Sequence, residues 1–260
     1  MKPPAWFSLS GRTALVAGAS RGIGLAIARE LAGAGARTIL AARSLEALEA
    51  EAERLRSEGL TAKALPLDVT DEGSIEAAVA AAPELDVLVY VAGINLRKRF
   101  LDYSRQQYEA VLATNLQGAV EMARAAGRRM IARGCGGKII FIGSMMSIRG
   151  LPYMTPYAVA KSALAGLTRA LAAEWARHNI QVNAILPGFI LTDLTRAVWA
   201  KPEMQAWLDG LLPAGRLGAP EEIAPLAVFL AGRGSDYITG QLIAVDGGYS
   251  TTAVWPLEPA

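Results

Sequence analysis

The chain has 260 residues, of which 52% are hydrophobic and 19% are charged. This composition excludes an intrinsically disordered protein, which needs low hydrophobicity and high net charge. The formal net charge of +2 excludes the broadly basic surface of a nucleic-acid-binding protein. One cysteine and one histidine exclude an internal disulfide and a metal site rich in thiolate or imidazole ligands. Any acid–base catalyst in this chain must therefore use another type of side chain.

Membrane and secretion signals are missing from the sequence. The longest uncharged stretch, residues 178–192, is interrupted by Pro187-Gly188 and is shorter than the roughly 18 residues that a membrane helix needs. The first ten residues have no apolar stretch typical of a signal peptide. We therefore expect a soluble, cytoplasmic protein that binds neither membrane nor nucleic acid.

Short apolar runs alternate with longer helical patterns along the whole chain. The runs cover Thr13–Ala17, Thr38–Ala42, Ala62–Leu67, Val87–Val91, Lys138–Ile142, Gln181–Leu186 and Gln241–Val245. The helical patterns include Ser44–Glu58, Ser74–Ala82 and Arg105–Arg133. Uninterrupted apolar strands separated by helices predict a parallel sheet covered on both faces. The expected fold is a single α/β domain over residues 1–260, a doubly wound Rossmann fold with a seven-stranded parallel sheet.

A glycine-rich turn follows the first predicted strand and opens a helical run from Leu25 to Gly33. Glycines here allow the backbone to approach a pyrophosphate, and the free N–H groups of the helix N-terminus favour an anion. A glycine-rich connection without a ligand would show the same pattern. The predicted dinucleotide site includes Gly18, Ser20, Arg21, Gly22, Ile23 and Gly24.

The end of the second predicted strand bears on the choice of dinucleotide. NAD sites usually carry an Asp or Glu there, whereas this chain has Ala41 and Ala42 followed by Arg43. Arg43 and Arg21 could flank a 2′-phosphate, and a hydrogen bond to a charged group contributes roughly 1.5–3 kcal/mol. We therefore expect a preference for NADP(H), with NAD(H) possible. The alternative is that both arginines are ordinary surface residues.

Tyr157 and Lys161 lie four positions apart in a helical pattern and share one face of it. Ser144 follows a predicted strand, at the edge where open α/β sheets bind ligands. A tyrosine acts at neutral pH only if its pKa falls from near 10, at a cost of roughly 3–4 kcal/mol. A lysine cation at about 4 Å supplies roughly that energy when the effective dielectric constant is near 20. Tyr157 is therefore the expected acid–base group.

These motifs resemble the short-chain dehydrogenase/reductase family over residues 9–249. The family's Asn-Ser-Tyr-Lys tetrad matches Asn115, Ser144, Tyr157 and Lys161. The resemblance implies that Tyr157 transfers the proton and that Lys161 binds the nicotinamide ribose and lowers the pKa of Tyr157. It implies further that Ser144 positions the substrate oxygen and that Asn115 holds a water that relays protons.

The resemblance also implies further cofactor contacts beyond the glycine turn. Matching residues are Asp68, Val69, Ala92, Gly93, Asn115, Tyr157, Lys161, Pro187, Gly188, Ile190 and Thr192. Without the tetrad, Asp68 would be explained equally well as a helix N-cap, and Pro187-Gly188 as a simple turn. Two positions depart from the family pattern: Ala17 replaces a Thr, and Tyr90-Val91 replaces Asn-Asn before Ala92-Gly93. Both departures affect supporting hydrogen bonds near the cofactor rather than the proton-transfer groups.

Cations cluster where the substrate is expected to enter. Arg97-Lys98-Arg99 follows the fourth predicted strand, and Arg149 follows Ser144. An arginine can bind a carboxylate through two parallel hydrogen bonds. This stretch is similar to gluconate 5-dehydrogenase-like members of the family, which interconvert gluconate and 5-keto-gluconate. A solvated loop or a subunit contact would also account for the charges. The expected substrate site contains Arg97, Ser144, Met146, Arg149 and Tyr157.

The expected activity is the interconversion of a secondary alcohol and a ketone. The nearest alternative is a 3-oxoacyl-[acyl-carrier-protein] reductase, whose acidic partner would also favour basic residues at the entrance. A dinucleotide-sensing scaffold is the alternative outside enzymes, but a sensor has no need of all four tetrad residues.

Residues 192–217 carry Trp199, Met204, Trp207 and Pro213 between the expected nicotinamide loop and a helix. An apolar, proline-interrupted insertion at this position predicts a mobile substrate lid, with a plain surface helix pair as the alternative. By resemblance, Gln241–Ser250 and the apolar tail Thr252–Leu257 help to form a homotetramer.

Overall fold

The computed structural model describes residues 5–250, apart from the side chains of Leu194 and Gln205. Seven strands form one parallel sheet in the order β3-β2-β1-β4-β5-β6-β7. Each apolar run predicted from the sequence overlaps one of these strands, so the doubly wound α/β fold is confirmed. The strands are β1 (Thr13–Ala17), β2 (Arg37–Ala42), β3 (Ala62–Pro66), β4 (Leu85–Tyr90), β5 (Gly137–Ile142), β6 (Ile180–Pro187) and β7 (Leu242–Val245).

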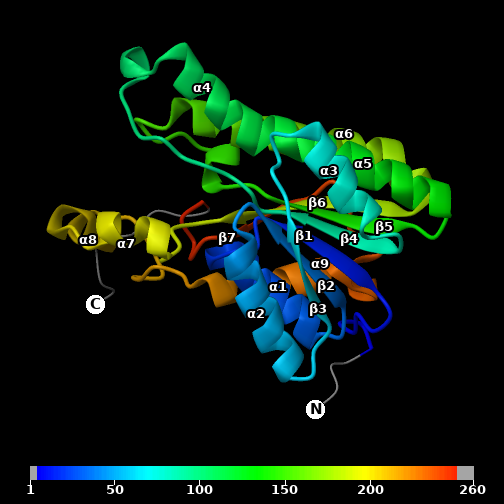
Figure 1. Cartoon of the computed structure of the whole chain (residues 1–260). Coiled ribbons are helices and arrows are strands. Elements are labelled where there is room, and N and C mark those ends of the chain that lie inside the picture. The colour runs from blue at the N-terminus through cyan, green and yellow to red at the C-terminus, as the bar shows by residue number, and fades with distance from the viewer. Residues whose placement is uncertain (1–4, 251–260) are drawn as a thin grey trace.

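Helices cover both faces of the sheet (Figure 1). One layer contains α1 (Gly22–Gly33), α2 (Leu45–Ser57) and α9 (Ala224–Ala231). The other contains α3 (Glu72–Ala80), α4 (Arg105–Leu112), α5 (Gly118–Arg133) and α6 (Thr155–Trp175). Because both faces are covered, the central strands β1, β4 and β5 are buried along their whole length. Two hydrophobic clusters result, one on each side of the sheet.

The turn between β1 and α1 brings the helix against the sheet. Gly18 has a φ of +96°, and a Cβ there would lie 2.6 Å from the backbone nitrogen of Ala92. A Cβ on Gly24 would overlap the carbonyl oxygen of Gly18. Only glycine satisfies both requirements, and the N-terminus of α1 is thereby held at the carboxyl edge of β1.

The segment Arg105–Arg133, expected as one helix, changes its winding in the middle. Between α4 and α5 lies a π-helical turn, Ala113–Gln117, in which the N–H of Gly118 donates to the carbonyl oxygen of Ala113, five residues earlier. A π-turn is a local widening that often occurs at functional sites. Asn115 lies in this turn.

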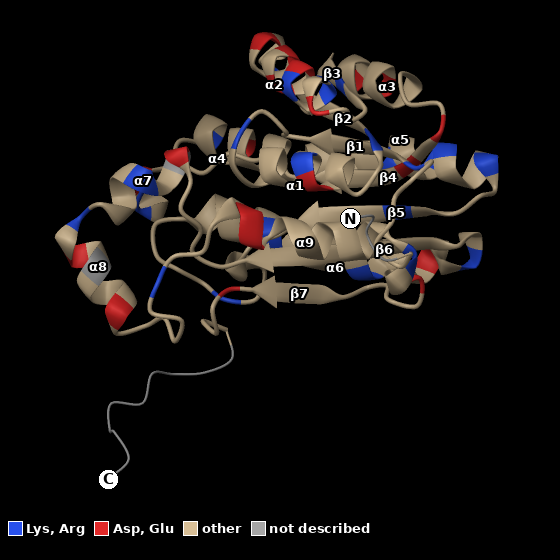
Figure 2. Cartoon of the chain, turned by 90° about the horizontal axis from the view of Figure 1, so that it is seen from below, with Lys and Arg blue, Asp and Glu red and all other residues tan. Residues whose placement is uncertain are grey.

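The arrowheads of the strands point to the end of the molecule at which α4, α7 (Asp193–Trp199) and α8 (Pro202–Asp209) gather (Figure 2). Cys135 is exposed in the loop that precedes β5, at the opposite, amino end of the strands. Among residues 5–250, no helix is both long and apolar enough to cross a membrane.

Candidate active site

Tyr157 and Lys161 lie in the first turns of α6, where Lys161 is buried and Tyr157 is half-buried. Lys161 is 3% exposed, its Nζ lies 5.6 Å from the centre of the Tyr157 ring, and it donates a 2.7 Å hydrogen bond to the carbonyl oxygen of Ile142. Burial lowers the pKa of Lys161 to about 8. The amine is therefore easy to deprotonate and is held against the end of β5.

Two opposing effects act on the pKa of the Tyr157 hydroxyl. Burial raises its pKa, whereas a hydrogen bond with Ser144 and the positive charge of Arg97 lower it. Lys161, which was expected to lower this pKa, has its Nζ desolvated and bonded to Ile142. In the chain by itself, burial is the dominant effect and Tyr157 is a protonated phenol.

Ser144 lies in a loop that is tied to α6 by hydrogen bonds. Its Oγ accepts from the Met146 N–H at 3.1 Å, and its own N–H donates to Ser147 Oγ at 3.3 Å. Ser147 Oγ in turn donates to the carbonyl oxygen of Lys161 at 2.8 Å. The loop after β5 and the helix bearing Tyr157 are thus one unit, and the buried Met146 side chain packs beneath it.

Asn115 is fully buried in the π-turn, which packs against α6. Its Nδ2 donates to the carbonyl oxygens of Ile94, at 2.8 Å, and Val111, at 2.9 Å. Its Oδ1 has no hydrogen-bond partner among the described residues, and a Cβ on Gly93 would overlap it. The structure therefore brings all four tetrad residues to one region, at the carboxyl ends of β4 and β5.

The glycine turn is flanked by two arginines. Arg21 is exposed, with extended backbone directly before α1, and Arg43 is exposed directly after β2. The charge of Arg43 helps to lower the pKa of Asp68, although hydrogen bonds from the Thr70 hydroxyl and N–H contribute more. Asp68 does not cap α3, because Asp71 does so. The two arginines and Asp68 thus lie around the ends of β1–β3.

The loop after β6 meets the glycine turn from the other side. Gly188 N–H donates to the carbonyl oxygen of Val245 at 3.0 Å, and Ile190 pairs with Gly218. Thr192 precedes α7, and its Cγ2 would lie 3.5 Å from a Cβ on Gly22. All the cofactor residues expected from the sequence therefore lie along one edge of the sheet.

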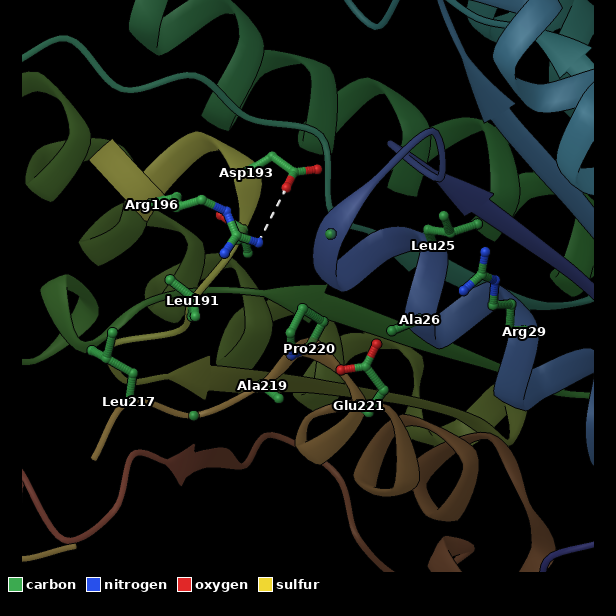
Figure 3. Close-up of a pocket in the computed structure, with 13 residues that line it drawn as sticks. Leu25, Ala26, Arg29, Leu191, Asp193, Arg196, Leu217, Ala219, Pro220 and Glu221 are labelled. Atoms are coloured by element: carbon green, nitrogen blue, oxygen red, sulfur yellow. Dashed lines mark ion pairs between the residues drawn. The ribbon is translucent and has the colours of Figure 1, made fainter. Parts of the chain in front are cut away.

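A cavity of about 410 Å³ lies where α1, α7 and residues 217–221 meet (Figure 3). Arg29 and Arg196 contribute cations to its wall, and Asp193 and Glu221 contribute carboxylates. Arg196 pairs with Asp193 at 3.6 Å. The cavity borders the glycine turn at Gly22 and the loop after β6 at Thr192.

The two arginines of the expected substrate site differ in their surroundings. Arg149 donates to the carbonyl oxygen of Tyr249 at 2.9 Å, and its guanidinium lies 4.9 Å from the centre of that ring. Arg97 is exposed, and its charge reaches the Tyr157 hydroxyl. Sequence reasoning missed Tyr249, because its partner Arg149 lies 100 residues earlier.

An aromatic cluster anchors α7 and α8 and was also not predicted. The ring of Phe189 lies 5.3 Å from Trp199, 5.3 Å from Trp207 and 4.9 Å from Tyr249, measured between ring centres. Phe189 lies between Gly188 and Ile190 in the expected nicotinamide loop. An aromatic residue inside that loop was the available signal, but its partners come from three separate segments.

Comparisons with known proteins agree with this geometry. A family model described as Enoyl-(Acyl carrier protein) reductase matches residues 18–250. Gluconate 5-dehydrogenase of Gluconobacter oxydans is 39% identical, covering 97% of this chain and 100% of that protein. The 5-keto-D-gluconate 5-reductase of Escherichia coli K12 is 40% identical, over 93% of this chain and 96% of that protein.

Among solved structures, a gluconate 5-dehydrogenase from Burkholderia cenocepacia in complex with NADP and tartrate superposes with a TM-score of 0.92. It is 39% identical and covers 96% of this chain and 99% of its own. The residues matched by the family model include the glycine turn and all four tetrad residues. The chain belongs to the short-chain dehydrogenase/reductase family of oxidoreductases.

Proposed function

We propose that this oxidoreductase uses NADP(H) to interconvert a secondary alcohol and a ketone on a sugar acid of the gluconate type. The observation that carries the proposal is the position of Arg97, an exposed cation whose field reaches the Tyr157 hydroxyl. A substrate with its reacting carbonyl at Tyr157 would then have a carboxylate partner nearby. The names of the relatives, and the NADP and tartrate of the Burkholderia structure, support the same class.

The glycine turn fits a dinucleotide. The close approach of Gly18 and Gly24 leaves the α1 N-terminus without side-chain obstruction, and its free N–H groups suit a pyrophosphate. Arg21 and Arg43 would hold a 2′-phosphate, and no carboxylate follows β2 to bind a ribose 2′-hydroxyl. When bound, the nicotinamide would supply or accept the hydride.

The side chains of the tetrad would donate, accept and relay the proton. Tyr157 donates its hydroxyl proton to the substrate oxygen during reduction and takes it back during oxidation, while Ser144 orients that oxygen. Lys161, cationic below its pKa of about 8, stabilises the phenolate that remains. Asn115, in the turn packed on α6, would hold the water through which a proton returns.

Arg97 is the better candidate for the carboxylate than Arg149, because Arg149 is already bonded to Tyr249. Arg97→Ala should raise KM for 5-keto-gluconate about tenfold or more, the equivalent of one lost charged hydrogen bond, and leave KM for an uncharged ketone within about twofold. Arg99→Ala, which removes an equally exposed cation from the same loop, is the matched control. Equal effects of Arg97→Ala and Arg99→Ala would rule out a specific carboxylate contact.

A substrate panel tests the function as a whole. Gluconate, 5-keto-gluconate, an acetoacetyl thioester and simple cyclic alcohols are assayed with both NADP(H) and NAD(H), for the wild type and for Tyr157→Phe. We expect the highest kcat/KM for the gluconate pair with NADP(H), and loss of activity in Tyr157→Phe. Preference for the thioester would favour the acyl-carrier-protein reductase, and a preference for NAD(H) would reject the role given to Arg21 and Arg43.

We further propose a homotetramer in the cytoplasm, where the nicotinamide pool is available, with residues 192–217 as the substrate lid. Support for the lid comes from the position of α7 and α8 at the carboxyl edge of the sheet. The tail Thr252–Leu257 lies outside the described residues. Light scattering that finds only monomer would reject the tetramer.

A further inference from the structure

Tyr90, the last residue of β4, is one of the two departures from the family pattern, and it is fully buried. Its hydroxyl donates a 2.5 Å hydrogen bond to the backbone carbonyl oxygen of Thr114. Thr114 directly precedes Asn115 in the π-turn. The bond therefore connects the central sheet to the turn that carries a tetrad residue.

The π-turn explains why Thr114 needs this donor. In a regular α-helix the N–H of Gly118 would donate to the carbonyl oxygen of Thr114, four residues earlier. Here that N–H donates to Ala113 instead. A buried carbonyl that loses its donor costs roughly 1–3 kcal/mol. The Tyr90 hydroxyl replaces the lost donor and so stabilises the wider winding relative to a regular helix.

Gly118 makes room for this arrangement. A Cβ on Gly118 would lie 2.5 Å from the Tyr90 hydroxyl oxygen and 2.6 Å from the carbonyl oxygen of Val69. A residue with a side chain at position 118 would therefore displace the hydroxyl from Thr114. The burial of Tyr90 and the nearby charge of Asp68 raise the pKa of its hydroxyl, so it remains a donor across the working pH range.

The turn also determines where the Asn115 side chain lies. Its Nδ2 bonds to Val111, one turn earlier, and to Ile94, in the loop that follows β4. If the turn relaxed to a regular helix, Asn115 would rotate relative to both acceptors and to Gly93. The position of Asn115 thus depends on the winding that Tyr90 stabilises.

We propose that Tyr90 is a positioning residue for the reaction: its hydroxyl holds the π-turn, and the π-turn holds Asn115 in the proton-relay position beside α6, the helix that carries Lys161. The proposal rests on the function proposed above only in so far as Asn115 serves proton return. It assigns no contact with substrate or cofactor to Tyr90.

Tyr90→Phe tests the proposal, because it removes the hydroxyl and keeps the ring. We expect kcat to fall about tenfold, with KM for cofactor and ketone within about twofold of the wild type. If proton return becomes slower, the ratio of kcat in H₂O to kcat in D₂O should rise, and the isotope effect of deuterated cofactor should shrink. A purely structural role would change neither ratio.

Val89→Ala is the matched control, since Val89 is the preceding buried residue of β4 and packs into the cluster on the opposite face of the sheet. It should lower the melting temperature but leave kcat and the solvent isotope ratio unchanged. Unchanged kcat in Tyr90→Phe, or equal kcat losses in both variants, would overturn the proposal.

A second, independent variant is Gly118→Ala, which displaces the Tyr90 hydroxyl while leaving Tyr90 in place. It should reproduce the fall in kcat and the larger solvent isotope ratio, and normal values would count against the proposal. All variants are assayed on whichever ketone the wild type reduces fastest. An inert wild type would refute the proposed function itself, whereas an active wild type with a normal Tyr90→Phe refutes only this inference.

Discussion

Burial acts on Lys161 and Tyr157 in the same chemical sense: it raises the pKa of the phenol and lowers that of the amine, so both neutral forms are favoured. Keeping these two groups desolvated lowers the stability of the folded chain. Catalytic residues commonly show such perturbed pKa values. The groups that lower the pKa of Tyr157 and so partly oppose the effect of burial are Ser144 and Arg97.

The cost of burying Lys161 should be visible in the pH dependence of unfolding. Its pKa falls from 10.5 to about 8 on folding, equivalent to about 3 kcal/mol. The folded state binds fewer protons between these two values, so this contribution increases stability as pH rises from about 8 to 10.5 and is constant below 8.

Lys161→Met removes this titration. We expect the free energy of unfolding of the variant, relative to the wild type, to be highest at pH 7 and to decline steadily above pH 8, as urea denaturation at several pH values would show. A difference that stayed constant from pH 7 to 10 would mean that Lys161 is not desolvated in the folded chain.

At the scale of elements, one aromatic ring connects α7 and α8, the proposed substrate lid. Phe189 contacts a tryptophan from α7, a tryptophan from α8 and Tyr249 beyond β7. Each aromatic pair contributes about 0.5–1.5 kcal/mol beyond the area it buries. Since Phe189 also belongs to the loop beside Thr192, the position of α7 and α8 is coupled to the loop expected to contact the nicotinamide.

Phe189→Leu should increase the mobility of α7 and α8, the proposed lid, without unfolding the sheet. Trypsin should cleave faster after Arg196, which lies on α7, and KM for substrate should rise about threefold to tenfold. Phe229→Leu, which changes a ring on α9, serves as the control. If trypsin cleaved after Arg196 at the same rate in both variants, Phe189 would not be the residue that anchors α7.

Strands were the part of the fold that the sequence predicted best, because a strand buried on both faces reads as an uninterrupted apolar run. The segment Arg105–Arg133 was predicted as one helix, since the apolar pattern of a helix barely changes across a single π-turn. The two windings differ in their hydrogen bonds: in the π-turn the N–H of Gly118 donates to Ala113, and the Tyr90 hydroxyl donates to Thr114. Local patterns carry no information on such partners.

The candidate site could likewise be predicted only in part from the sequence. Ser144, Tyr157 and Lys161 could be named from the helical spacing of Tyr157 and Lys161 and from the strand before Ser144, whereas Asn115 came only from the resemblance to the family. The choice between Arg97 and Arg149 could not be made from sequence, because it depends on Tyr249, which lies far along the chain from both. The aromatic cluster was likewise hidden, since Phe189, Trp199 and Tyr249 come from separate elements.

The whole molecule is organised around a sheet that separates two hydrophobic clusters. Leu164 of α6 is fully buried on one side and Leu31 of α1 on the other. The strands between them belong to one hydrogen-bonded sheet. We therefore expect the two clusters to unfold together, as a single cooperative unit, although their side chains do not share contacts.

Leu31→Ala and Leu164→Ala should each lower the free energy of unfolding by about 2–5 kcal/mol. Because the two sites lie on opposite faces, the double variant should lose the sum of the two within about 0.5 kcal/mol, in one transition. Guanidinium denaturation followed by both fluorescence and circular dichroism would measure this. Two separate transitions would show that the chain contains two folding units.

The exposed thiol of Cys135 allows the chain to be labelled at a single position for single-molecule fluorescence. It is the one cysteine in the sequence, and it lies at the amino end of the strands, away from α7, α8 and the tetrad. One maleimide dye can therefore be attached to each subunit with no engineering and no disturbance of the reacting groups. Counting photobleaching steps per particle would then report directly how many chains assemble.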